Sequence, residues 1–124
     1  MTRLGIPLDE IETIIKHRDM LTGGLNLIIF LYPQDVSIYH VDADYEITSY
    51  ELRRSVDKDS LVELLMVLYD PDESPIENSL LVFDGSRRKL VLRASSTALL
   101  QNIHRLSEKI LVELEKITWG KENV

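Results

Sequence analysis

Two acidic stretches of the chain are the first candidates for metal chemistry. Their alternating positions are Asp42, Asp44 and Glu46 in the first, and Asp70, Asp72 and Ser74 in the second. A calcium loop between two helices needs a glycine at its sixth position and a bidentate glutamate at its twelfth, and neither stretch has them. Pro71 and Pro75 also interrupt the second stretch. We therefore interpret both as solvated turns, and the sequence predicts no bound metal.

Patterns for nucleophilic or acid–base catalysis are missing from the sequence. The chain has no cysteine, no Gly-x-Ser-x-Gly motif and no glycine-rich phosphate loop. His40 is next to Tyr39 and close to Asp42, but adjacent residues of a strand point to opposite faces of a sheet. We interpret His40 as a strand residue, and His17 and His104 as helix-surface residues. The sequence therefore predicts no catalytic residue, no cofactor and no enzymatic activity.

Basic residues gather in one expected hairpin. They are Arg87, Arg88, Lys89 and Arg93. Aromatic residues do not alternate with them, and the whole chain carries a net charge of −7, which disfavours nucleic acid and anionic membranes as partners. An acidic surface is compatible with a basic protein partner. We interpret the basic end of the hairpin as a solvent-exposed turn. The alternative is that it contacts an acidic segment of a partner.

The strongest candidates for protein binding are apolar. Residues Ser60 to Asp70 form an expected middle helix whose apolar side chains point in almost all directions, with only Glu63 and Asp70 in a polar sector. One sheet can cover one face of such a helix, so the remainder requires a second helix or a second copy of the chain. Met66 and Val67 are therefore expected partner-binding residues, and the sequence predicts a homodimer.

A second apolar pair stands on the last expected helix. Val112 and Trp119 are seven residues apart and share the charged face of that helix. An exposed tryptophan often anchors a protein interface. The alternative is that Trp119 folds back onto its own domain. We expect both residues to contribute to partner binding or to a larger self-interface.

Hydrophobic periodicity and turn residues predict the elements that position these side chains. Helices are expected from about Asp9 to Thr22, Ser60 to Asp70 and Ser96 to Thr118, and strands over Leu25 to Tyr32, Val36 to Val41, Tyr45 to Leu52, Ser79 to Phe83 and Lys89 to Arg93. Expected capping boxes pair Asp9 with Glu12, and Ser60 with Glu63. The expected core includes Ile28, Phe30, Leu65, Leu81, Leu92, Leu106 and Ile110.

The expected fold class is α+β, in the order α-β-β-β-α-β-β-α. Short connections favour a mostly antiparallel five-stranded sheet with three helices, in a single domain over residues 1–124. Apolar residues make up 44% and charged residues 28% of the chain, which is typical of a folded globular domain. The longest apolar run, Leu27 to Leu31, is too short to span a bilayer. Without cysteines or a signal segment, the chain is expected to be cytoplasmic.

This pattern resembles the type III secretion chaperones of Gram-negative bacteria. The resemblance rests on the meander Leu25–Leu52, the middle helix Ser60–Asp70, the hairpin Ser79–Arg93 and the last helix closed by Trp119. It implies an acidic homodimer, formed with the help of the middle helix, that binds an extended segment of a secreted protein without a cofactor. The segment Leu4-Gly5-Ile6-Pro7 before the first helix departs from the family pattern.

Two other classes of protein remain open on the sequence. An acidic immunity or antitoxin protein would use the negative surface to block a basic toxin. A roadblock- or longin-like regulator of a small GTPase has a similar mix of helices and sheet, although it orders its strands two then three. Here three strands precede the middle helix and two follow it.

Overall fold

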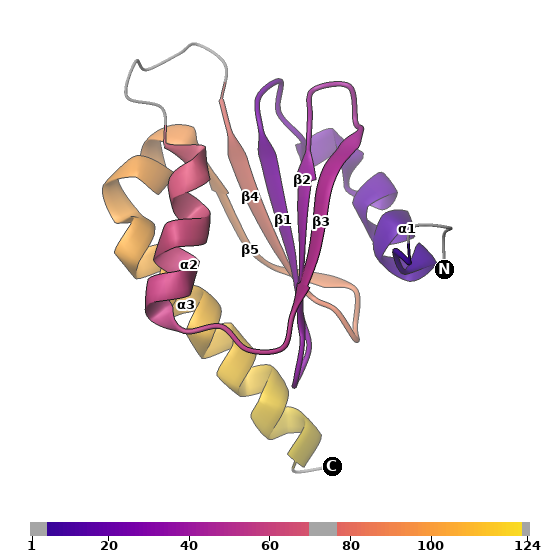
Figure 1. Ribbon diagram of the computed structural model, residues 1–124, viewed down its shortest axis with the longest axis vertical. Helices are drawn as coiled ribbons and strands as arrows, with labels where there is room; N and C mark the ends of the chain where they lie inside the picture. The colour runs from indigo at the N-terminus through magenta and orange to yellow at the C-terminus, as the bar shows by residue number, and fades with distance from the viewer. Residues whose placement is uncertain (1–4, 70–76, 123–124) are drawn as a thin grey trace.

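A computed structural model describes residues 5–69 and 77–122, excluding the side chains of residues 96–101 and 121–122. The elements are α1 (Leu8–Lys16), a 3-10 turn η1 (Arg18–Met20), β1 (Asn26–Leu31), β2 (Val36–Val41), β3 (Ile47–Arg53), α2 (Lys58–Leu65), a 3-10 turn η2 (Met66–Leu68), β4 (Ser79–Asp84), β5 (Lys89–Ser95) and α3 (Ser96–Glu122). The predicted α+β class and the predicted order of elements are confirmed (Figure 1).

The sheet has the strand order β3-β2-β1-β4-β5. The pairs β1–β2, β2–β3 and β4–β5 are antiparallel, as expected for strands joined by short turns. The central pair β1–β4 is parallel, because α2 carries the chain from the β3 edge back to the middle of the sheet. The sheet is therefore mostly antiparallel, as predicted, around one parallel pair.

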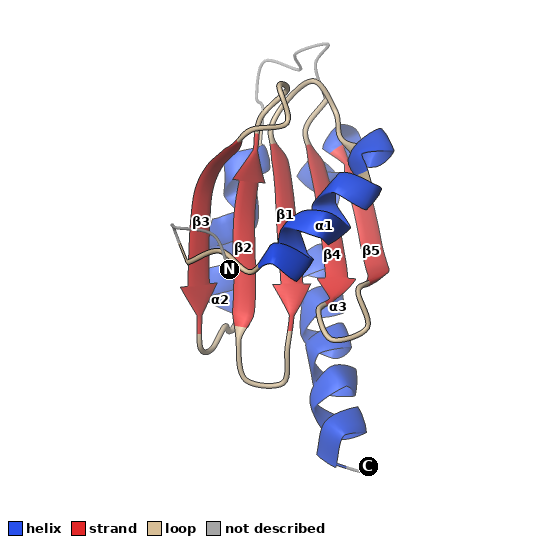
Figure 2. Cartoon of the chain, turned by 90° about the vertical axis from the view of Figure 1, so that its right-hand side faces the viewer, coloured by secondary structure: helices blue, strands red, loops and turns tan. Residues whose placement is uncertain are grey.

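The helices cover both faces of this sheet. In Figure 2, α1 crosses in front of the strands, while α2 and α3 lie behind them. Every residue of β1 and β4 is buried, which explains why both strands are apolar almost without interruption. On the α2–α3 face the core includes Leu27, Ile29, Leu65, Val82, Leu106 and Ile110. On the α1 face it includes Ile14, Ile28, Phe30, Tyr39, Leu81 and Phe83.

The predicted core is confirmed at six of its seven positions. Ile28, Phe30, Leu65, Leu81, Leu106 and Ile110 are all buried. Leu92 is only partly buried against the α2–α3 core. It lies on β5, an edge strand with a neighbour on one side only.

The helix ends differ from the sequence prediction. The helix α1 begins at Leu8 without a side-chain cap, so the capping box at Asp9 was wrong. It ends at Lys16, and Nδ1 of His17 donates to the carbonyl of Thr13 at 2.8 Å. This hydrogen bond satisfies one of the free carbonyl groups at the end of the helix, well before Thr22.

The cap of α2 also differs from the prediction. The backbone N–H of Ser60 donates to the carboxylate of Asp57 at 2.8 Å, and the N–H of Asp57 donates to the hydroxyl of Ser60 at 3.0 Å. The box therefore pairs Asp57 with Ser60, three residues before the predicted position. The hydrogen bond from the backbone N–H of Ser60 lowers the pKa of the Asp57 carboxyl group.

We expect Leu106→Ala to lower the free energy of unfolding by about 2–5 kcal/mol, because it removes a buried side chain from α3 and leaves a cavity. Leu106 is 6% exposed. Leu52→Ala is the matched control, since that side chain is 54% exposed, and its cost should stay within about 0.5 kcal/mol. Urea unfolding of the two variants measures the difference. Equal losses would contradict the burial of Leu106.

Candidate functional site

The end of the middle helix exposes large apolar side chains. At Leu65 the α-helix gives way to the tighter turn η2, which alters the direction of the side chains that follow. Leu68 remains buried, but Met66, Val67 and Tyr69 are 48%, 47% and 48% exposed. We call these three half-exposed side chains the η2 surface.

A hollow of about 420 Å³ borders the η2 surface. Val62, Met66 and Tyr69 line one side of it. The opposite side is the start of α3, with residues Asn102, Ile103, His104 and Arg105. Because Ile103 is only 8% exposed, the floor of this hollow is apolar, and His104 and Arg105 make a polar rim.

The helices that carry this surface are held together from within. Leu61 and Leu65 of α2 pack with Leu106 and Ile110 of α3 in one core. At the other end of α2, Nζ of Lys58 donates to Glu108 of α3 at 2.8 Å. This hydrogen bond lowers the pKa of the Glu108 carboxyl group. The sequence prediction that another element covers part of the middle helix therefore holds for α3, while α1 lies on the other side of the sheet.

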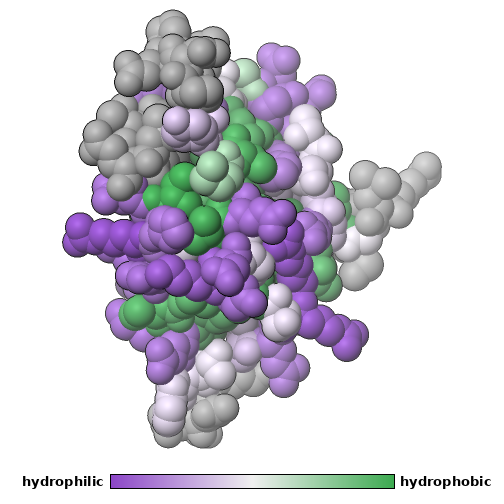
Figure 3. All heavy atoms as spheres, turned by 60° about the vertical axis from the view of Figure 1, so that its left-hand side comes forward, coloured by the Kyte–Doolittle hydropathy of each residue, from purple (hydrophilic) through white to green (hydrophobic). Residues whose placement is uncertain are grey.

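The second predicted apolar pair is also exposed. Val112 and Trp119 of α3 are 47% and 57% exposed. Val112 lines a hollow with Val91 and Leu92 of β5, whereas Met66 lines the hollow beside α2. Figure 3 shows hydrophobic side chains in two areas of this side of the molecule, with a hydrophilic band between them. Met66 and Val112 thus line two different hollows, and all four predicted partner-binding residues are exposed.

Tyr69 is a member of the η2 surface that sequence reasoning did not select. Its spacing of three residues from Met66 was the signal that could have included it. Leu8 and Ile15 of α1, 52% and 51% exposed, are further apolar side chains that the prediction did not name. They lie on the opposite face of the sheet, so they belong to neither surface.

Asp42, a candidate for metal chemistry, has a structural role. Oδ1 of Asp42 accepts the backbone N–H groups of Asp44 and Glu46 at 2.9 and 3.0 Å, which closes a turn. Residues 70–74 lie outside the described residues. Among those that are described, no three histidine, aspartate or glutamate side chains form a group able to hold a metal. Tyr39 is buried beneath α1, while its neighbour His40 is on a strand whose alternation turns it to the other face.

Glu10 makes a buried polar cluster that the sequence did not suggest. Its carboxylate is 2% exposed and accepts hydrogen bonds from the phenols of Tyr32 and Tyr39 at 2.5 and 2.6 Å. Burial, the hydrogen bond to Glu10 and the negative charge of Glu10 raise the pKa of both phenols. Both phenols therefore stay protonated above the pH at which a free tyrosine ionises. Their hydrogen bonds to Glu10 anchor α1 to the sheet.

Comparisons with family models, curated proteins and solved structures give no match to this chain. Within the described residues, no helix combines the length and apolar character needed to cross a membrane. The fold and the site thus define an α+β domain with two exposed apolar surfaces on its α2–α3 side.

Proposed function

We propose that this protein is a non-catalytic protein-binding module that forms a homodimer through the η2 surface. The observation that carries the proposal is the half exposure of Met66, Val67 and Tyr69, of which Met66 and Tyr69 line a hollow with an apolar floor. In a two-fold arrangement, each copy contacts the same residues of the other. In the proposed dimer, the η2 surface of one copy fills the hollow of its partner.

The area required by a dimer extends beyond three side chains. A stable interface buries about 800 Å² on each partner. The neighbouring rim of α3 at His104 would therefore join the contact. Apolar side chains would fill the centre and polar ones the edge, which is the usual composition of a protein interface.

In this proposal the module acts like a small acidic chaperone and holds a segment of another protein. The proposal starts from the meander, middle helix, hairpin and long last helix of this chain, the elements on which the resemblance to type III secretion chaperones was drawn. Val112 and Trp119 are separate from the η2 surface and remain available for the partner.

We expect Val67→Glu to convert a dimer into a monomer, because the interface would bury a carboxylate without a partner. Light scattering over a concentration series measures the mass. Ile15→Glu is the matched control: it makes the same change at a similarly exposed isoleucine, 51% exposed, on the opposite face. Its mass should remain that of the dimer.

Salt provides a second readout of the same association. Two chains of net charge −7 repel one another, and salt screens this repulsion. The dimer should therefore tighten as salt rises. A wild-type protein that stays monomeric at every concentration and salt level would disprove the homodimer.

A further inference from the structure

The outer edge of β5 is an unpaired strand edge. This strand is last in the sheet order and pairs with β4 alone among the described residues. In the described part of the chain, the backbone hydrogen bonds made outside helices and strands involve no residue of Lys89–Ser95. An edge strand presents N–H and C=O groups that an extended peptide can use to add one more strand.

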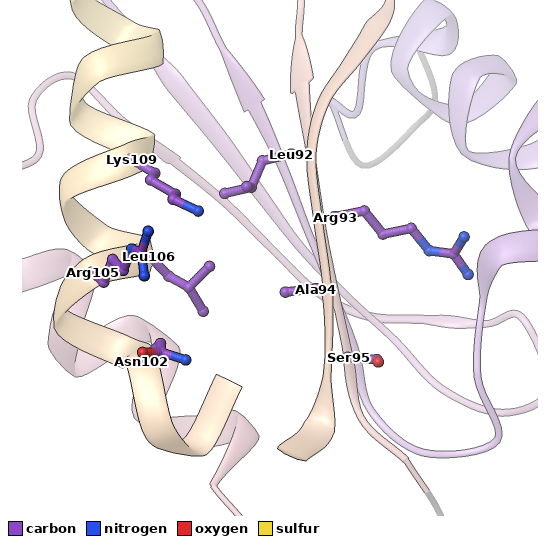
Figure 4. A pocket seen from close by; sticks show the side chains of 8 residues that line it. All are labelled: Leu92, Arg93, Ala94, Ser95, Asn102, Arg105, Leu106 and Lys109. Carbon is purple, nitrogen blue, oxygen red and sulfur yellow. The ribbon is translucent and has the colours of Figure 1, made fainter. Parts of the chain in front are cut away.

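A groove runs between this edge and α3. It consists of three successive hollows, the first of about 410 Å³. Neighbouring hollows share Leu92, Arg105 and Lys109, and then Val91 and Glu113. Figure 4 shows Leu92 and Ala94 of β5 facing Leu106 of α3, while Arg93 points to the other side of the strand. We call this feature the β5–α3 groove.

The groove is basic although the chain as a whole is acidic. Among the described residues, Lys89, Arg105 and Lys109 form no ion pair within 4.0 Å. The acidic side chains near them are already occupied: Glu113 by Lys116 at 3.5 Å, Asp84 by Arg87 at 3.9 Å and Glu108 by Lys58 at 2.8 Å. Three cations therefore remain along a groove whose apolar floor includes Leu92 and Val112.

We propose that the β5–α3 groove binds an extended acidic segment of a partner protein. The segment pairs with the edge of β5, and its alternate carboxylates point toward α3 and lie near Lys89, Arg105 and Lys109. This inference rests on the proposed function, because it names the kind of partner that the module holds. A second copy of the chain fits less well, because pairing two β5 edges brings cations of the same sign together.

The test uses a labelled peptide of about ten residues that alternates glutamate and valine, long enough to span the seven residues of β5. Fluorescence anisotropy should detect binding to the full chain. The double variant Lys89→Glu with Lys109→Glu, whose two residues line the groove and not the hollow beside the η2 surface, should bind about tenfold more weakly or worse. A lysine–valine peptide should not bind, and a central proline should weaken binding, because it removes a strand hydrogen bond.

The matched control is the double variant Arg18→Glu with Arg54→Glu. It changes the net charge by the same amount at two exposed cations outside the groove. At about 0.15 M salt the screening length is about 8 Å, so this control should keep binding within about twofold. Equal weakening in both double variants would overturn the proposal. So would the absence of binding, or binding that proline does not disturb.

The dimer and the groove can fail independently. Rising salt should weaken peptide binding while it tightens the dimer. Val67→Glu should abolish the dimer and leave peptide binding unchanged. A dimer that does not bind the acidic peptide overturns the groove alone, whereas a monomer that binds it overturns the homodimer alone.

Discussion

Glu10→Ala is expected to lower the free energy of unfolding by about 2–5 kcal/mol. The substitution leaves the Tyr39 hydroxyl, which is fully buried, without the carboxylate that accepts its proton at 2.6 Å. Tyr32 also loses its acceptor, although this side chain is partly exposed and can bond to water. A cavity beneath α1 adds to the cost.

Urea unfolding at neutral pH measures this loss. Glu12→Ala is the control, because Glu12 is exposed on the same helix and its loss should cost at most about 0.5 kcal/mol. Glu10→Gln should fall between the two, since its amide oxygen still accepts one hydrogen bond. A Glu10→Ala variant as stable as the wild type would show that α1 does not depend on the cluster.

Local sequence patterns predicted the five strands and their order along the chain. The strand β2 has the predicted bounds, Val36–Val41, because turn residues bracket an alternating segment. The strand β1 is central, as its nearly continuous apolar character indicated. What a local pattern cannot specify is the parallel neighbour of β1, since β4 follows β1 only after two more strands and a helix.

Asn26 shows why contacts between distant parts of the chain could not be predicted from local sequence patterns. It interrupts the apolar run of β1 and is fully buried. Its side chain accepts from the hydroxyl of Ser79 at 2.6 Å and donates to the carbonyl of Val41 at 3.2 Å. Both partners are distant in sequence, and the parallel pairing of β1 with β4 places Asn26 opposite Ser79.

The sequence predicted the hairpin turn at Gly85, and the structure adds a second reason for a glycine at this position. Asp84-Gly85 is a common turn signal. In the structure, a Cβ atom on Gly85 would lie 2.3 Å from the ring of Tyr32. That ring is also tied to Glu10 by its hydroxyl. The glycine is therefore required by close packing against a side chain 53 residues away, which no local pattern reveals.

The candidate surfaces were only partly predictable. Met66 and Val67 could be selected because the middle helix has more apolar residues than one sheet can cover. Their half exposure depends on the turn η2, whose onset at Met66 the helix pattern did not indicate. Of the groove's cations, sequence reasoning considered Lys89 for contact with an acidic segment, but only as an alternative. It missed Arg105 and Lys109, because they are ordinary charged residues of a helix until packing sets them beside β5.

At alkaline pH, stability should fall more steeply in the wild type than in Tyr39→Phe. An unfolded tyrosine loses its proton near pH 10, whereas burial and Glu10 raise the pKa of Tyr39 in the folded protein. The stability that comes from the neutral phenol is therefore complete below about pH 10 and is lost as the pH rises above it. Each phenol that stays protonated in the fold contributes a slope of about 1.4 kcal/mol per pH unit.

Tyr39→Phe removes this contribution, so its slope between about pH 10 and 12 should be shallower by about 1.4 kcal/mol per pH unit. Urea unfolding at several pH values gives both slopes. Tyr45→Phe is the control, because Tyr45 is 62% exposed and should leave the slope unchanged. The pKa of Tyr32 is also raised by burial and Glu10, so Tyr32 adds a decline that both proteins share. Identical slopes for the wild type and Tyr39→Phe would mean that the phenol of Tyr39 ionises as freely in the fold as in the unfolded chain. The hydrogen bond that this phenol donates to Glu10 would then contribute nothing to the attachment of α1.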